Sequence, residues 1–181
     1  MNNIFGFRDL HAYIWLIALV FSIHEIEEWN ILKWYKRHYK NLPGSTNTSI
    51  RIHIVVLIAV SLLLTLLAFL ARETFLFSLI VVFISAFILQ NFLQHVIWTV
   101  QLKAYSTGLV TSILSVVTVA FVHVLLIQNH LIILTFYAMV LLIIPPLVRT
   151  MKVKGEMTKD VLAVHHFFIK VEKAIRGIVK R

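Results

Sequence analysis

Three of the eight acidic residues of this chain lie within four positions, directly after an apolar run, in the string His24-Glu25-Ile26-Glu27-Glu28. On a helix that turns about 100° per residue, Glu27 and Glu28 flank the direction of His24, so one imidazole and two carboxylates share a face. Glu25 points about 100° away. Imidazoles and carboxylates are ligands of zinc and ferrous iron, and a carboxylate can also transfer protons as a general acid or base.

A second polar string, Gln90-Asn91-Phe92-Leu93-Gln94-His95, interrupts another apolar run. Asn91 and His95 are four residues apart and therefore share a helix face. A helix that enters the membrane at Phe75 rises about 1.5 Å per residue, which places His95 about 30 Å along, at the depth expected for the glutamates. We therefore expect the two polar faces to meet. Interhelical hydrogen bonding without a metal is the alternative for Asn91 and His95.

Two other histidines differ in their expected depth. His53 follows Arg51 at the start of an apolar run, so we expect it near the level of His95, either as a supporting group together with Asn91 or as a plain interfacial residue. His123 comes about 24 Å into its own run and belongs nearer the opposite side of the membrane. We expect it to have no role in the cluster.

These residues predict a divalent metal site in which His24, His95 and one glutamate, Glu28 or Glu27, are ligands and the other glutamate is a general acid or base. Three protein ligands leave a position open for water, whose pKa zinc lowers towards about 7, as ester or amide hydrolysis requires. Two histidines and one carboxylate also suit ferrous iron and oxygen chemistry. We expect zinc rather than iron. The structural alternative is a set of ion pairs between the glutamates and the basic loop that follows them.

Composition places these residues in a membrane protein. The chain of 181 residues is 60% hydrophobic and 14% charged, its mean hydropathy is +0.89, and it has no cysteine. These values exclude a soluble enzyme, and the missing cysteines exclude thiolate chemistry. Apolar runs of about 20 residues predict an all-α bundle of about five transmembrane helices. The expected spans are 12–29, 50–71, 75–101, 107–128 and 131–149, and we expect the last to end at Pro145 and Pro146.

Basic residues gather in the loop after the first span and in the tail after the last. The positive-inside rule places both in the cytoplasm, so the N-terminus lies outside and the C-terminus inside, in what we expect to be a bacterial plasma membrane. No cleavable signal peptide is expected. The purely apolar part of the first span, Ala12 to Ile23, is too short to cross alone, so an interfacial or re-entrant first segment is an open alternative.

We divide the chain into a transmembrane domain, 1–150, and a basic tail, 151–181. From about Thr158 the tail places apolar residues at helical spacing among lysines and arginines, which predicts an amphipathic interfacial helix on the anionic inner leaflet. Membrane lipids are therefore the expected partners. The net charge of +9 comes mostly from segments that flank apolar runs, so we expect no nucleic acid. A homo-oligomer is compatible with the sequence.

The polar residues resemble a known family pattern. His24, Glu27 and Glu28 match the motif of the HXXEE family of small integral membrane proteins, and the chain resembles that family over roughly its first 150 residues. Members carry a further histidine in a later helix, which His95 matches best in its Asn91-x-x-x-His95 setting.

A Tyr-x-Pro-Gly motif follows that histidine in the family. Here Tyr105 and Gly108 match, while Thr107 replaces the proline, so the resemblance implies a looser turn at this point. The resemblance implies enzymatic activity without an assigned reaction, and it adds Tyr105 to the candidate catalytic residues beside Glu27 and Glu28. Taken alone, Tyr105 would be an interfacial anchor.

The sequence therefore predicts a metal-dependent membrane hydrolase that acts on a lipid or an amphiphile at the inner leaflet, where a buried site is most easily reached by a lipid. Proton-coupled transport through the glutamates is the second hypothesis, since intramembrane carboxylates often serve pumps and exchangers. A non-haem iron oxidase, hydroxylase or desaturase acting on a lipid is another alternative. A silent subunit of a membrane assembly would show neither bound metal nor proton flux.

Overall fold

The computed structural model describes residues 7–71, 73–129, 133–152 and 155–179. All secondary structure assigned within these ranges is helical. The elements in chain order are α1 (Phe7–Glu27), the short 3-10 helix η1 (Glu28–Asn30), α2 (Leu32–His38), α3 (Asn47–Leu70), α4 (Thr74–Leu102), α5 (Leu109–Gln128), α6 (Ile133–Lys152) and α7 (Lys159–Val179). The prediction of an all-α protein is confirmed.

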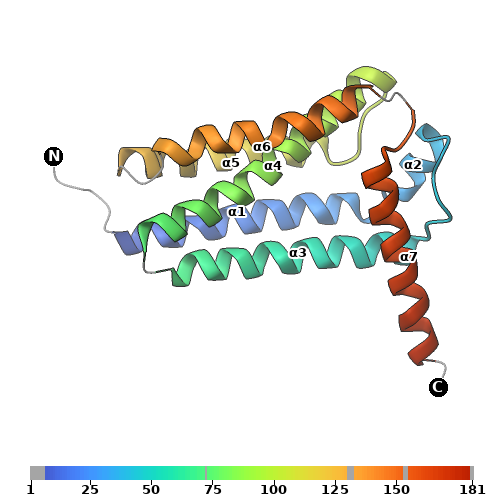
Figure 1. Cartoon of the computed structure of the whole chain (residues 1–181), viewed down its shortest axis with the longest axis horizontal. Helices are drawn as coiled ribbons and strands as arrows, with labels where there is room; N and C mark the ends of the chain where they lie inside the picture. Colours follow the sequence, from blue (N-terminus) through green and yellow to red (C-terminus); the bar gives the residue numbers. More distant parts are fainter. Residues whose placement is uncertain (1–6, 72, 130–132, 153–154, 180–181) are drawn as a thin grey trace.

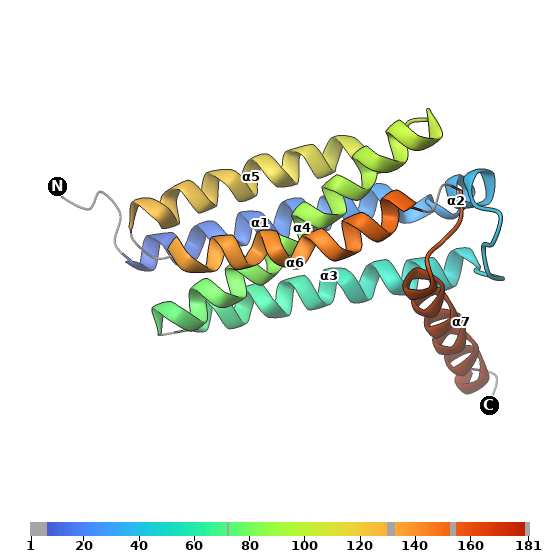
Figure 2. The same cartoon turned by 45° about the horizontal axis from the view of Figure 1, so that its top comes forward.

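The long helices form a bundle with α1 and α4 at its centre. Helix α1 packs against α3 and α5, and α4 contacts α3, α5 and α6. Figure 1 and Figure 2 show α4 crossing the bundle obliquely, while α7 lies across the end that also carries α2. The ends of α1 and α4 and the start of α5 therefore meet at this end of the bundle, together with α7.

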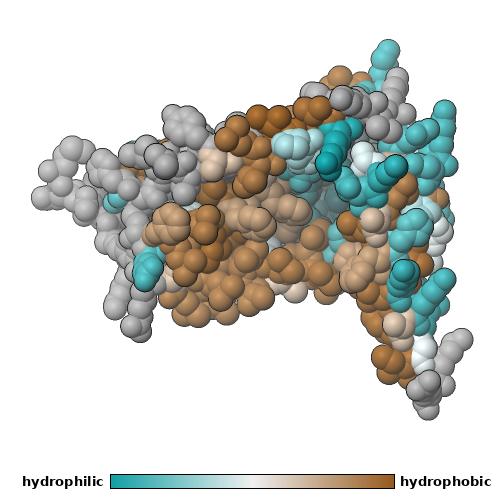
Figure 3. All heavy atoms as spheres, viewed as in Figure 1, coloured by the Kyte–Doolittle hydropathy of each residue, from teal (hydrophilic) through white to brown (hydrophobic). Residues whose placement is uncertain are grey.

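Three of the described helices are long and apolar enough to cross a membrane, namely Asn47–Leu70, Phe75–Leu102 and Leu109–Gln128. Large apolar side chains such as Leu63, Phe83 and Val117 are exposed on their surfaces. Figure 3 shows a broad hydrophobic surface along the bundle, with polar residues gathered at the end of α2 and α7. An apolar surface of this extent is typical of a protein whose solvent is lipid. The chain is therefore a membrane protein.

The helix bounds lie within a few residues of the predicted spans, with two differences. Regular α1 ends at Glu27, so Glu28 lies in the 3-10 turn that follows. Helix α6 runs through Pro145 and Pro146 to Lys152, so the expectation that the prolines end it was wrong. A proline removes one backbone hydrogen bond, but membrane helices tolerate this loss where neighbouring groups satisfy the freed carbonyl.

Helix α7 is attached to the start of α3. Thr46 caps α3 reciprocally with Ser49, and its hydroxyl also donates to Oε2 of Glu172 on α7, 2.5 Å away. His165 Nδ1 lies 2.9 Å from the hydroxyl of Ser45. The buried face of α7 carries His165, Phe168 and Glu172, while Phe167, Ile175 and Ile178 are exposed. The predicted tail helix is present, and it packs on the bundle through a partly polar face.

Candidate metal centre

Two histidines and a glutamate from three elements converge at the α2 and α7 end of the bundle. His24 comes from the last turn of α1, Glu28 from η1 and His95 from α4. One potential ligand atom of each lies within 4.8 Å of those of the other two. His24 and His95 are each 1% exposed and Glu28 is 9% exposed. The tighter 3-10 turn at Glu28 carries its carboxylate next to the His95 ring.

Hydrogen bonds at Nδ1 fix the orientation of the His24 ring. Its Nδ1 lies 3.0 Å from the hydroxyl of Thr111, and that hydroxyl donates to Oε2 of Glu27 at 2.6 Å. Because the Thr111 proton goes to the carboxylate, Thr111 accepts from His24, and Nδ1 carries the imidazole proton. Nε2 of the neutral ring then holds a lone pair, and this buried atom has no hydrogen-bond partner. An oriented histidine with a free Nε2 is the arrangement found at protein metal ligands.

The His95 ring is held in the same manner. Its Nδ1 lies 2.8 Å from the hydroxyl of Ser106, and its Nε2 lies 3.1 Å from Oε1 of Glu28. Lone pairs on these two atoms would repel each other at this distance, so either a proton or a metal ion must lie between them. Ligand atoms about 2.0–2.1 Å from a tetrahedral zinc ion lie about 3.3 Å apart. The observed separation is close to that value, so this pair of ligand atoms fits a zinc ion, and the three potential ligand atoms all lie within 4.8 Å of one another.

Gly108 closes the site from the loop between α4 and α5. Its φ angle is +94°, in the left-handed region that favours glycine. A Cβ at this position would lie 2.8 Å from Oε1 of Glu28, 2.9 Å from Cε1 of His24 and 3.0 Å from Cε1 of His95. The missing side chain therefore faces the point where all three side chains converge, and only glycine leaves room there.

Glu27 lies beside the cluster and faces a different set of partners. Its carboxylate accepts hydrogen bonds from Thr111 and from the hydroxyl of Tyr105, the latter at 3.2 Å. Tyr105 is 55% exposed, and its backbone carbonyl accepts from Nε1 of Trp34. Burial and the neighbouring Glu27 carboxylate raise the pKa of the Tyr105 phenol. Glu27 therefore supports His24 through Thr111, and Tyr105 is a neutral hydrogen-bond donor at the surface.

A cavity of about 420 Å³ leads from the cluster towards α6 and α7. Glu28 and His95 line it beside Glu25, which is 1% exposed and whose Oε1 has no hydrogen-bond partner. Further polar side chains also line the cavity, including His53, Asn91, Gln90, Gln94, Arg149, Asp160 and His165. A volume of this size is typical of small-molecule sites.

The structure thus brings His24, Glu28 and His95 together and places the other candidates around them. Asn91 lines the cavity and approaches His24. His53 lines the same cavity, with its ring 4.5 Å from that of Phe168 on α7. His123 is buried in α5 and lies outside the group of His24, Glu28 and His95.

A family model described as a protein of unknown function with HXXEE motif matches residues 15–123. This range contains the complete cluster and the loop that closes it. The chain belongs to the HXXEE family. Comparisons with curated proteins and with solved structures gave no match. Family membership confirms the resemblance found in the sequence, and the chemistry must be argued from the site.

Several residues of this HXXEE protein that shape the site were not predicted from sequence. Thr111 and Ser106 orient the two imidazoles. Ser106 directly follows Tyr105, and Thr111 comes three residues after Gly108. Glu25 was expected on another face, yet it lines the cavity. His165 was not among the candidate residues, yet it is buried, lies within hydrogen-bond distance of Ser45 and lines the cavity.

Proposed function

We propose that this HXXEE protein is a metal-dependent membrane enzyme, a hydrolase that acts on a lipid or another amphiphile. The observation that carries the proposal is the buried, unpartnered Nε2 of His24, which shares one small space with Nε2 of His95 and Oε1 of Glu28. Three such ligands would hold a divalent cation, with zinc favoured. Zinc bound by three protein ligands acidifies a water molecule and polarises a carbonyl or phosphoryl oxygen.

The side chains around the ligands have separable tasks in this proposal. Thr111 and Ser106 hold the imidazole protons at Nδ1, so both Nε2 atoms remain available. Glu27 supports Thr111, and the neutral Tyr105 hydroxyl fixes Glu27. Glu25 is the acid or base, because it lines the cavity beside Glu28 and its Oε1 has no hydrogen-bond partner. Residues of the cavity wall exclude bulk water from one side of a bound amphiphile.

The proposal includes five membrane crossings, with α1 and α6 added to the three helices of sufficient apolar length. The basic α2 and α7 end then faces the cytoplasm of a bacterial plasma membrane, and the N-terminus lies outside. The exposed apolar face of α7, with Phe167, Ile175 and Ile178, would lie in the anionic inner leaflet. An amphiphile in that leaflet would lie at the same depth in the membrane as the cavity and could reach it there.

Iron-dependent oxidation of a lipid is the second candidate, because two histidines and one carboxylate are also the ligand set of non-haem iron oxygenases. The same cluster would serve both reactions. The identity of the bound element separates them.

Elemental analysis of the protein tests the proposal. The protein should be purified in detergent without chelators and without a histidine tag, offered zinc or ferrous iron, and freed of excess ion. We expect stoichiometric metal in the wild type and its loss in His24→Ala and His95→Ala. His123→Ala, at an equally buried histidine outside the group, should keep the metal. Full metal in both ligand variants would show that the site is wrong, and wild-type protein without metal would favour proton-coupled transport.

A further inference from the structure

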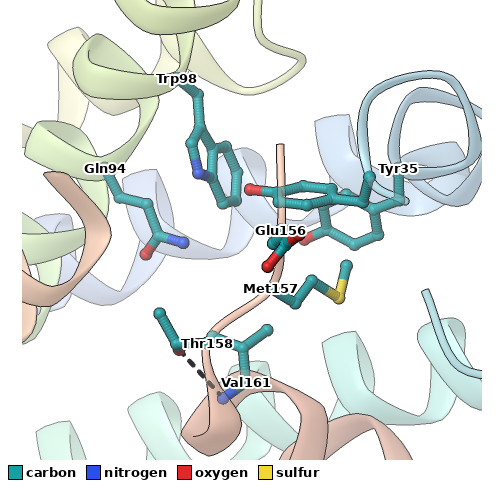
Figure 4. Close-up of a pocket in the computed structure, with 8 residues that line it drawn as sticks. Tyr35, Gln94, Trp98, Glu156, Met157, Thr158 and Val161 are labelled. Carbon is teal, nitrogen blue, oxygen red and sulfur yellow. Dashed lines mark hydrogen bonds between the residues drawn. The ribbon is translucent and has the colours of Figure 1, made fainter. Parts of the chain in front are cut away.

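A small aromatic pocket adjoins the metal-site cavity. Rings of Tyr35, Tyr39 and Trp98 have centroids 5.8, 6.0 and 6.1 Å apart, and their planes meet at 71°, 85° and 76°. The three rings therefore contact one another edge to face, and all three line the pocket. Figure 4 shows the Gln94 amide and the Glu156 carboxylate pointing towards the space below Trp98.

Backbone contacts hold the Glu156 side of this pocket in place. Asn41 accepts from the Met157 N–H at 2.7 Å and donates to the Met157 carbonyl at 2.9 Å. The Lys40 N–H donates to the Gly155 carbonyl at 3.1 Å. The segment before α7 is thus fixed on the loop between α2 and α3, so Glu156 has a defined place at the pocket.

The chemistry of the pocket suits a cation. Aromatic faces carry a negative quadrupole and attract ammonium groups, and quaternary ammonium ligands are bound in this way. Burial raises the pKa of both Tyr35 and Tyr39, so the phenols are neutral and Glu156 supplies the negative charge. Among the described residues, no Lys or Arg forms an ion pair with Glu156.

The size of the pocket limits what it can hold. Its volume is about 40 Å³. That is room for about three water molecules at ~10–15 Å³ each, or for the few non-hydrogen atoms of an ammonium group. A larger aromatic or sugar ring does not fit.

The pocket and the metal-site cavity are adjacent and share part of their lining. Tyr35, Gln94, Trp98, Thr158 and Val161 line both. The Trp98 ring lies 5.3 Å from the ring of His95, one helical turn away on α4. A molecule held by its cationic end in the pocket would therefore extend along the cavity past the metal cluster.

We propose that the aromatic pocket of Tyr35, Tyr39, Trp98 and Glu156 binds the ammonium headgroup of an amphiphile and so selects the substrate of the neighbouring site. The substrate class is a lipid with a choline-type or ethanolamine-type headgroup. This inference rests on the proposed function for the role of substrate, while binding of the ammonium group depends on the pocket alone.

Calorimetric titration of the full-length protein in detergent tests the pocket directly. The probes are choline and its neutral tert-butyl isostere, which has the same shape without the charge. We expect choline to bind about tenfold more tightly than the isostere. Glu156→Gln should weaken choline about fivefold and Tyr39→Leu about tenfold. Glu73→Gln, an exposed carboxylate outside the pocket, should change nothing. Equal affinities for choline and the isostere would overturn the proposal.

Two further experiments are needed. The first separates the pocket from the metal site, and the second separates a lipid headgroup from a free ammonium solute. His24→Ala should lose metal and keep choline, and wild-type protein that binds zinc but not choline would refute the pocket alone. In nanodiscs of phosphatidylcholine, choline should bind several-fold more weakly than in nanodiscs of phosphatidylglycerol, because the lipid headgroup occupies the pocket. Equal binding in both would reject the lipid headgroup in favour of a free ammonium solute. Loss of zinc binding would show that Tyr39→Leu does not fold. In that case Glu156→Gln and the comparison of choline with its isostere still test the pocket.

Discussion

Gly108→Ala is the sharpest test of the metal centre, because the added methyl group would enter the space between the three ligands. Its Cβ would lie 2.8 to 3.0 Å from Glu28, His24 and His95, whereas ordinary contact begins at 3.4 Å. The ligands would have to move by 0.4 to 0.6 Å, which is the difference between these distances and ordinary contact. Functional constellations tolerate about 0.5 Å of displacement.

The free-energy cost of Gly108→Ala has two parts, the backbone conformation and the contact of the new Cβ with the ligands. Alanine substitutions at two other glycines separate these parts. Alanine at a φ of +94° costs about 1–2 kcal/mol of folding free energy whatever surrounds it. Gly155→Ala carries the same backbone cost at a φ of +72°, yet its Cβ meets only the His38 carbonyl, at 3.5 Å. Gly44→Ala carries neither cost, since nothing lies within 4 Å of its Cβ.

The assay is a competition titration of zinc against a chromophoric chelator, paired with thermal unfolding of the metal-free protein. We expect Gly108→Ala to lose about 10- to 100-fold in zinc affinity, the range found when the surroundings of metal ligands are disturbed. Gly155→Ala should be destabilised to a similar degree and keep wild-type zinc affinity, and Gly44→Ala should match the wild type in both. Wild-type zinc affinity in a folded Gly108→Ala protein would refute the geometry of the site.

Three further predictions follow from the same contacts. Thr111→Val removes the hydroxyl between His24 and Glu27, so zinc affinity should fall about tenfold in the chelator titration and Thr111→Ser should restore it; equal affinity in both would deny that Thr111 orients His24. Glu25→Gln should keep zinc, as elemental analysis would show, and lower the hydrolysis of ester-bearing amphiphiles at least about 100-fold, in line with the loss of a general acid or base; unchanged turnover would exclude Glu25 from that role. Burial and the neighbouring His166 lower the pKa of His165 from 6.5 to about 4. The folded state therefore binds this proton less readily than the unfolded state, so the contribution to stability is complete above about pH 6.5 and lost as the pH falls towards 4, by about 3 kcal/mol at most. Hydrogen exchange of α7 should accelerate over this range in the wild type and change less in His165→Gln, which has no titratable group; identical profiles would assign the acid sensitivity elsewhere.

The fold was largely predictable because membrane helices are specified by apolar length. The apolar runs predict α3, α4 and α5 to within a few residues, because the length of each run is set by the thickness of the membrane rather than by local helix propensity. The course of α6 through Pro145 and Pro146 was not predictable from propensity, which ignores the neighbouring α4.

The candidate site was predictable in part for a related reason. Burying an ionisable side chain within a membrane-spanning apolar run costs free energy, so such residues are rare and easily recognised in a sequence. This distinguishes His24, Glu28 and His95. Thr111 and Ser106 are common helix and loop residues whose importance comes only from the partners that the fold gives them. A regular helical wheel assigned Glu25 to another face, yet Glu25 lines the cavity beside Glu28, which lies in the 3-10 turn after regular α1 ends.

The contacts also bear on the plainest alternative to a metal, in which the glutamates form ion pairs. Within the described residues, neither Lys33 nor Arg37 of α2 pairs with them. A protonated His95 would form an ion pair with Glu28 alone. It would leave Nε2 of His24 buried without a partner, at a cost of about 1–3 kcal/mol, and it would not explain why three side chains converge below a glycine. One cation bound by all three groups removes both difficulties at once, because it accepts the lone pairs of both imidazoles and the charge of the carboxylate together.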